Sequence, residues 1–124
     1  MQKFFYIKKQ TKLIFLESPG TATFDIIDIP LITKIAKKHK IVTVCDNTWA
    51  TPLHLKPLDL GVDVSIHSAT KYICGYSDLL MGVATVNKKY AAIFDAFYHS
   101  LENYTNPHDC YLALRGLRTL EVRL

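Results

Sequence analysis

Two short apolar runs, placed 24 residues apart around a helical pattern, constrain the fold of this chain more than any other feature. Leu13–Leu16 and Ile41–Cys45 are both uninterrupted apolar or β-branched runs, which is typical of strands buried on both faces. Each run ends at a polar residue, Glu17 after the first and Asp46 after the second. A strand, a helix and a strand in this order predict a parallel βαβ unit over residues 13–45.

The segment between the two runs carries the signals of a helix. Asp28 can cap its N-terminus, and Pro30 suits the first turn because that position needs no backbone N–H. Apolar residues then recur at helical spacing on one side, and we expect the other side to be exposed. The predicted inner side is Leu31, Ile32, Ile35, Ala36 and His39, and the predicted exposed side is Thr33, Lys34, Lys37, Lys38 and Lys40.

The rest of the chain extends the same pattern. We predict strands at Val62–Ile66 and Gly82–Val86, a helix at Lys89–His99, and a final helix at Asp109–Leu124 after an Asn106-Pro107 cap. The length of 124 residues suits one small domain. The predicted fold class is therefore α/β, with a mostly parallel sheet and flanking helices, and ligands of such sheets collect at the carboxyl ends of the strands.

Composition excludes several classes of function. The net charge of +4 comes with no basic stripe lined by aromatic residues, so nucleic-acid binding is not expected. No run reaches membrane-spanning length and no signal peptide is evident, so we expect a cytoplasmic protein with no membrane partner. Three widely separated cysteines and scattered histidines fit neither a disulfide framework nor a metal site.

One group of polar residues at the predicted strand ends points to a cofactor. Pyridoxal 5'-phosphate (PLP) needs an amine for its aldehyde, a carboxylate for its ring nitrogen and donors for its phosphate. Lys71, Asp46 and the hydroxyls of Ser68 and Thr70 supply these three requirements. A pyridinium and a carboxylate about 3 Å apart attract by roughly 5 kcal/mol at an effective dielectric near 20, so we expect Asp46 to be buried against the ring.

Each of these residues also has an ordinary interpretation. Lys71 alone is a typical solvated surface lysine, and an Asp-Asn pair after a strand is most often a turn or a cap. We expect Trp49 to be a packing residue, and Arg115 and Arg118 to form structural ion pairs. The joint placement at one sheet edge favours the functional interpretation.

Four ordered motifs resemble the PLP-dependent trans-sulfuration enzymes of Cys/Met metabolism. They are Asp46–Ala50 (DNTWA), Gly61–Ser65 (GVDVS), Ser68–Tyr72 (SATKY) and Arg115–Leu120 (RGLRTL). Within that family, the stretch Glu17–Thr21 (ESPGT) is most similar to the cystathionine beta-lyase branch. Gly75–Asp78 reads GYSD, where many relatives have GHSD.

The resemblance implies a role for each candidate residue. Lys71 would form the imine with the cofactor and then remove the α-proton of the substrate, Asp46 would pair with the pyridine nitrogen, and Ser68 and Thr70 would bind the phosphate. The implied reaction is β-elimination of cystathionine to homocysteine, pyruvate and ammonia, as in methionine biosynthesis. A γ-synthase or γ-lyase is the alternative within the family.

The resemblance also implies an incomplete enzyme. Family members are far longer, so residues 1–124 are expected to be part of the large, PLP-binding domain of a type I PLP-dependent transferase-like fold, without the family's N-terminal segment and C-terminal domain. The family forms homo-oligomers, and complementing fragments are a possible source of the other parts. A non-catalytic remnant, a split-gene piece and a cofactor-binding or subunit-interaction module remain open as alternatives.

Overall fold

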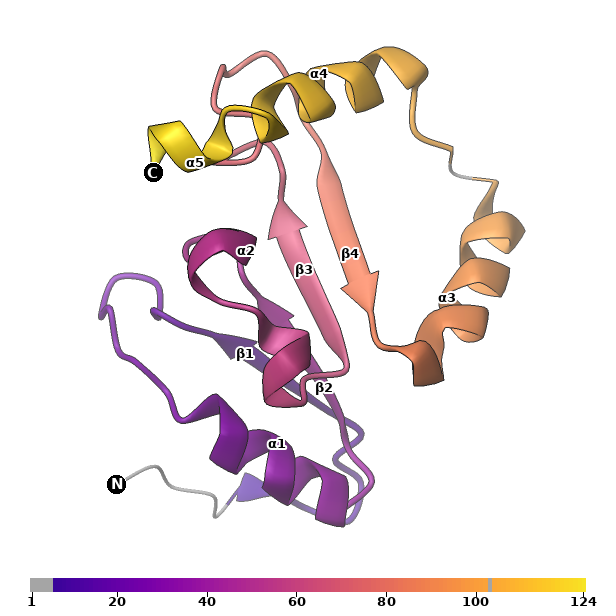
Figure 1. Cartoon of the computed structure of the whole chain (residues 1–124). Coiled ribbons are helices and arrows are strands. Elements are labelled where there is room, and N and C mark those ends of the chain that lie inside the picture. The colour runs from indigo at the N-terminus through magenta and orange to yellow at the C-terminus, as the bar shows by residue number, and fades with distance from the viewer. Residues whose placement is uncertain (1–5, 103) are drawn as a thin grey trace.

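The structure is a computed structural model that describes residues 6–102 and 104–124. Ten elements follow one another along the chain (Figure 1). They are β1 (Leu13–Glu17), α1 (Ile29–Lys38), β2 (Val42–Asp46), α2 (Thr51–His54), the 3₁₀-helix η2 (Pro57–Leu60), β3 (Val64–Ser68), β4 (Gly82–Val86), α3 (Lys88–Leu101), α4 (Pro107–Leu117) and α5 (Leu120–Arg123).

The four strands form one sheet in the order β1-β2-β3-β4. The pairs β1·β2 and β2·β3 are parallel, and β4 runs antiparallel to β3. The predicted βαβ unit over residues 13–45 and the mostly parallel sheet are therefore confirmed. The register places Glu17 opposite Asp46, so two carboxylates end neighbouring strands at one edge of the sheet.

Helix α1 begins as predicted, but its exposed side differs from the prediction. The Asp28 side chain accepts a hydrogen bond from the Leu31 N–H at 2.9 Å, and Pro30 lies in the first turn. Thr33, predicted to be exposed, is buried, and its hydroxyl donates to the Leu60 carbonyl at 2.9 Å. Leu31, predicted to face inward, is 41% exposed. Because α1 contacts η2 as well as the sheet, its buried side is turned toward Thr33.

The main core lies between α1 and one face of the sheet. It is formed by Leu16, Ile29, Ile32, Cys45 and Val62. The opposite face of β1 is open, since Leu13 is 50% and Phe15 is 57% exposed. The prediction that this strand is buried on both faces is therefore wrong: its sequence is apolar throughout, but described elements cover only one side.

A second, smaller core joins α4 to the loop after β3. It is formed by Cys74, Leu79 and Leu112. Arg115 of α4 pairs with Asp78, which confirms its predicted role, and this hydrogen bond lowers the pKa of the Asp78 carboxyl. Arg118 is exposed and forms no ion pair with any residue that the structure describes.

The predicted final helix, Asp109–Leu124, is two helices in the structure. α4 ends at Leu117 and α5 begins at Leu120. Thr119 has φ −111° and ψ 3°, outside the helical region, and its hydroxyl donates to the Gly116 carbonyl at 3.1 Å. This turn redirects the chain so that α5 lies beside the loop after β3.

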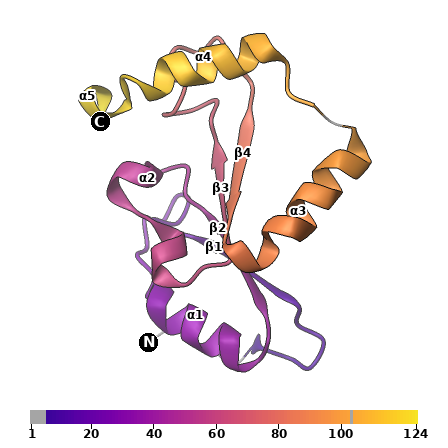
Figure 2. The same ribbon diagram turned by 45° about the vertical axis from the view of Figure 1, so that its right-hand side comes forward.

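Helix α3 extends from the base of β4 and has no buried residue (Figure 2). Its apolar side chains are exposed to solvent: Ile93 63%, Phe94 37%, Phe97 61%, Tyr98 42% and Leu101 55%. Among the residues described, the helices are too short or too polar to cross a lipid bilayer.

Candidate functional site

Asp46 and Ser68 lie on the same face of the sheet. Asp46 pairs with Ile66 in the β2·β3 register, and side chains two residues apart along a strand share a face, so Ser68 shares the face of Ile66. Both residues end their strands at the carboxyl edge. The sequence prediction that parallel pairing brings these two residues to one edge is confirmed.

Thr48 connects the two residues by hydrogen bonds. Asp46 Oδ1 accepts from the Thr48 backbone N–H at 2.9 Å and from the Thr48 hydroxyl at 2.6 Å. The same hydroxyl oxygen accepts from the Ser68 N–H at 2.8 Å. The carboxylate of Asp46 is thus oriented by a short turn, and its other oxygen, Oδ2, is left for a further partner.

Lys71 lies in the turn that follows β3. Its backbone N–H donates to the Ser68 carbonyl at 3.0 Å, and its side chain is exposed. Arg123 of α5 holds the next residues of this turn, donating to the carbonyls of Tyr72 at 2.9 Å and Ile73 at 3.2 Å. The position of the lysine backbone therefore depends on the C-terminal helices.

Thr48 links residues that line two different hollows. A hollow of about 560 Å³ is lined by Asp46, Ser68 and Thr70, among others, and one of about 460 Å³ is lined by Lys71 and Thr48. Thr48 lines the second hollow and hydrogen-bonds to Asp46 and Ser68, which line the first.

The Thr70 hydroxyl already has partners in the backbone. It accepts from the Met81 N–H at 2.9 Å and donates to the Met81 carbonyl at 3.3 Å. Since a hydroxyl has one hydrogen, Thr70 can donate to a phosphate only by turning away from Met81. The Ser68 hydroxyl, by contrast, has no hydrogen bond to any other described residue, so Ser68 is the better placed donor.

Trp49, expected to be a packing residue, packs against another aromatic ring outside the core. It is 46% exposed and stacks on Tyr72, with ring centroids 5.9 Å apart and planes inclined by 21°. Both rings line the Lys71 hollow together with Glu17. Two aromatic residues and a carboxylate thus surround the lysine, because the turns after β1, β2 and β3 meet there.

Burial and nearby carboxylates shift two groups close to Asp46. The pKa of the buried Cys45 thiol is raised to about 11, chiefly by burial and then by Asp46 and Glu17. Burial lowers the pKa of His67, although Asp46 opposes the shift. His67 therefore favours its neutral form, and it is a half-buried residue of β3.

The donor set fits PLP. Asp46 has a carboxylate oxygen without a partner among the described residues, Ser68 has a free hydroxyl, and Lys71 has an exposed amine. In the described part of the chain, no three His, Cys, Asp or Glu side chains gather in a way that could hold a metal ion. The structure thus offers the groups that PLP requires.

The role of Thr48 was missed in the sequence, although its motif was noticed. The signal was a threonine two residues after a strand-ending aspartate, a spacing at which a carboxylate accepts hydrogen bonds from the backbone and hydroxyl of a turn. The hydrogen bond from Ser68 to Thr48 spans 20 residues, and no local pattern indicates it.

A sequence profile of the family described as "Cys/Met metabolism PLP-dependent enzyme" matches residues 4–124. The chain belongs to this family. It is 54% identical over 121 residues to an L-alanine/L-glutamate racemase of Wolbachia pipientis wMel, and 44% identical over 123 residues to the cystathionine beta-lyase MetC of Bacillus subtilis. Both alignments cover 95% of the chain, but only 29% and 30% of the respective relatives.

A solved structure shows the same fold. The cystathionine gamma-lyase of Lactobacillus plantarum, complexed with L-serine, matches with a TM-score of 0.87 and 35% identity over 94% of the chain and 31% of that enzyme. The predicted fold class, part of a type I PLP-dependent fold, is confirmed by this match. The chain spans about a third of the length of the relatives it matches.

Proposed function

We propose that the chain is part of the PLP-binding domain of a carbon–sulfur lyase that acts on cystathionine by β-elimination. The observation that carries the proposal is the hydrogen-bonded path from Asp46 through Thr48 to Ser68, which ends beside the turn of Lys71. When bound, PLP supplies an electron sink for the pair released at the substrate α-carbon. Cleavage of the β carbon–sulfur bond would release homocysteine, and hydrolysis of the remaining three-carbon enamine by water would give pyruvate and ammonia.

Each residue has a definite task in this proposal. The Lys71 amine binds the aldehyde covalently and, once a substrate amine has displaced it, takes the α-proton, a step that typically contributes about 10²–10⁴ in rate. Asp46, whose Oδ1 is held by Thr48, would bind the protonated pyridine nitrogen of the cofactor. The Ser68 hydroxyl donates to the phosphate, and Thr70 assists after leaving Met81.

The proposal extends to the whole enzyme. Most of the length of each relative lies outside the part that this chain matches. We propose that the active assembly is a cytoplasmic homo-oligomer that also contains the parts of the enzyme outside the region matched here.

The proposal is tested by PLP binding. The chain should bind PLP and develop the visible absorbance of a lysine-bound cofactor, alone or with the separately expressed remaining parts of the Wolbachia pipientis relative. Borohydride reduction followed by mass spectrometry should then find the cofactor on Lys71. Lys71→Ala should abolish both signals, and Lys34→Ala, an exposed lysine of α1, should leave them unchanged.

Two results would contradict this assignment. The first is cofactor trapped on a lysine other than Lys71, and the second is no signal from the chain either alone or in the mixture. Binding without release of pyruvate from cystathionine in the complemented mixture would favour a non-catalytic, cofactor-binding module.

Racemisation is a second candidate function, favoured by the 54% identity to an alanine/glutamate racemase. Both reactions begin when a lysine removes the α-proton, and they differ in the next step. A lyase expels the β-sulfur, whereas a racemase returns a proton to the opposite face of the α-carbon. Pyruvate from cystathionine supports the lyase, and D-alanine from L-alanine in the same complemented protein supports the racemase.

A further inference from the structure

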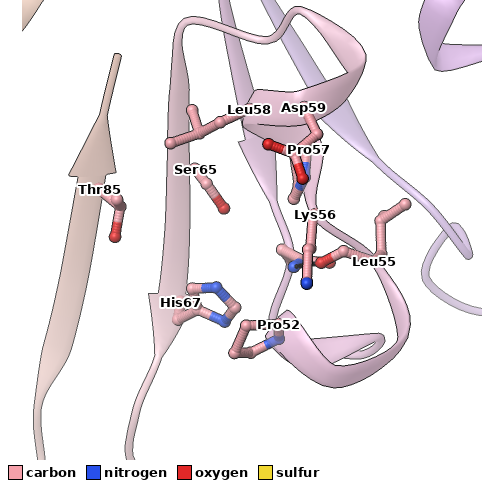
Figure 3. Close-up of a pocket in the computed structure, with 10 residues that line it drawn as sticks. Pro52, Leu55, Lys56, Pro57, Leu58, Asp59, Ser65, His67 and Thr85 are labelled. Atoms are coloured by element: carbon pink, nitrogen blue, oxygen red, sulfur yellow. Dashed lines mark hydrogen bonds between the residues drawn. The ribbon is translucent and has the colours of Figure 1, made fainter. Parts of the chain in front are cut away.

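A third hollow lies on the other face of the sheet (Figure 3). Its volume is about 260 Å³, and Ser65 and His67 of β3 project into it toward the segment 52–59. Side chains alternate along a strand, so these two residues face away from Asp46 and Ser68. We call this space the β3–η2 hollow; it lies on the other face of β3 from Asp46 and Ser68, although His67 lines their hollow as well.

Three buried polar atoms of this hollow have no hydrogen-bond partner among the described residues. They are Asn47 Oδ1, Ser65 Oγ and His67 Nδ1. Asn47 is only 1% exposed and Ser65 only 4% exposed. A buried polar atom without a partner costs about 1–3 kcal/mol, so three such atoms around one space indicate that something polar binds there.

The hydrogen-bonding directions of these groups can be assigned. Asn47 Nδ2 donates to the Leu55 carbonyl at 2.8 Å, which assigns the amide and leaves its Oδ1 as an acceptor without a partner among the described residues. The Ser65 hydroxyl can donate or accept, and the half-buried ring of His67 favours its neutral form. The polar side chains of Asn47, Ser65 and His67 therefore offer hydrogen bonds without carrying a full charge.

The walls restrict the ligand further. Pro52, Leu55, Pro57 and Leu58 form an apolar side, and the charged groups that line the hollow, Lys56 and Asp59, are exposed and of opposite sign. Inserting an ion against these neutral polar groups and the apolar wall would cost its hydration, and Lys56 and Asp59, being exposed and of opposite sign, would offset each other as counter-charges. An uncharged ligand with both donors and acceptors avoids that cost.

We propose that the β3–η2 hollow binds a small molecule bearing an uncharged carboxamide on a short apolar body. A carboxamide N–H would donate to Asn47 Oδ1, its carbonyl would accept from the Ser65 hydroxyl, and its second N–H would donate to His67 Nδ1. The apolar body would lie against Leu55 and Pro57. This arrangement satisfies all three unpartnered atoms with one functional group.

The test is a titration of the isotope-labelled 124-residue chain with propionamide, followed by the backbone amide NMR shifts. Saturable shifts should centre on Asn47, Ser65 and His67. Propionate, which is charged and has no N–H, and butanone, which lacks both N–H donors, should each bind about a hundredfold more weakly, the equivalent of two net hydrogen bonds.

Ser65→Ala separates ligand binding from stability. It should weaken propionamide binding about tenfold and leave the melting temperature of the free chain unchanged or higher, because it removes a buried hydroxyl that lacks a partner. Ser100→Ala, on the exposed side of α3, is the matched control and should change neither quantity.

Two outcomes would overturn the proposal. The first, measured on the wild-type chain alone, is the lack of a saturable shift with propionamide, or shifts with propionate that equal those with propionamide. Alternatively, Ser65→Ala could lower the melting temperature while leaving binding intact, which would assign the hydroxyl to ordered water or to the fold.

Discussion

Cys45 combines complete burial with two carboxylates near its thiol. Its side chain has no exposed surface, and burial together with Asp46 and Glu17 raises its pKa from 9.0 to about 11. The folded state therefore favours the neutral thiol more than the unfolded state does. The resulting stability is complete below about pH 9 and is lost as the pH rises toward 11.

This shift predicts an alkaline loss of stability that depends on one residue. The experiment compares the two proteins between about pH 8.5 and about pH 11. Over this range the free energy of unfolding should fall by on the order of 2 kcal/mol more in the wild type than in Cys45→Ala. Urea unfolding at several pH values measures it. If the unfolding free energies of the two proteins instead change in parallel with pH, the thiol has the same pKa in the folded and unfolded states, which contradicts the prediction.

Thr48 is the single side chain that joins the two strand ends of the candidate site. Thr48→Val keeps the shape but removes the hydroxyl, leaving the Ser68 N–H without its acceptor. We expect a loss of about 1–3 kcal/mol in unfolding free energy and weaker PLP binding, because Asp46 loses one of its two fixed partners.

Thr48→Ser should rescue both effects, since it restores the hydroxyl. Chemical denaturation and a PLP titration measure the two quantities. Equal PLP affinity in the Val and Ser variants would show that the Thr48 hydroxyl does not contribute to PLP binding.

At the scale of elements, the turn that carries Lys71 depends on α4 and α5. A Cβ added at Gly116 would collide with the carbonyl oxygens of Ile73 and Cys74, which are backbone atoms that no side-chain rotation can move. Arg123 also donates to the Gly116 carbonyl, at 2.8 Å, besides holding the turn itself. The close approach of α4 to the turn thus requires glycine.

Gly116→Ala should separate α4 from this turn. We expect a loss of about 3 kcal/mol in unfolding free energy, the upper end for overpacking, and reduced trapping of PLP on Lys71. Gly82→Ala, where the nearest atom to an added Cβ is 3.9 Å away, should be tolerated. Equal effects of the two substitutions in thermal unfolding would contradict this explanation.

At the scale of the whole molecule, much apolar surface remains uncovered. β4 is an edge strand without charge or proline, and residues 82–85 are exposed. α3 exposes Ile93 and Phe97 by more than half. Open edges and apolar patches of this kind promote association.

We therefore expect the isolated chain to self-associate with increasing concentration. The double substitution Ile93→Lys and Phe97→Glu should reduce association without lowering the melting temperature, because neither side chain is buried. Leu112→Ala, in the small core under α4, should lower the melting temperature without reducing association. Sedimentation velocity and thermal unfolding distinguish these outcomes, and a monodisperse wild-type chain would contradict the prediction.

The sequence alone was sufficient for the four strands along the chain, for the parallel βαβ unit of the first two, and for the edge that gathers Asp46 and Ser68. Those features follow from the periodicity of neighbouring residues and from the rule that parallel strands end at the same edge of a sheet. Both can be applied without knowing any long-range contact. The cap at Asp28 could be predicted for the same reason, since it involves residues three positions apart.

Only the tertiary structure decided which of these surfaces are covered and which distant groups meet. Phe15 is exposed and Thr33 is buried because burial depends on whether another element packs there, and neighbouring residues do not determine that. The hydrogen bond between Thr48 and Ser68, the turn that divides α4 from α5, and the polar floor of the β3–η2 hollow likewise depend on contacts between segments far apart in the chain.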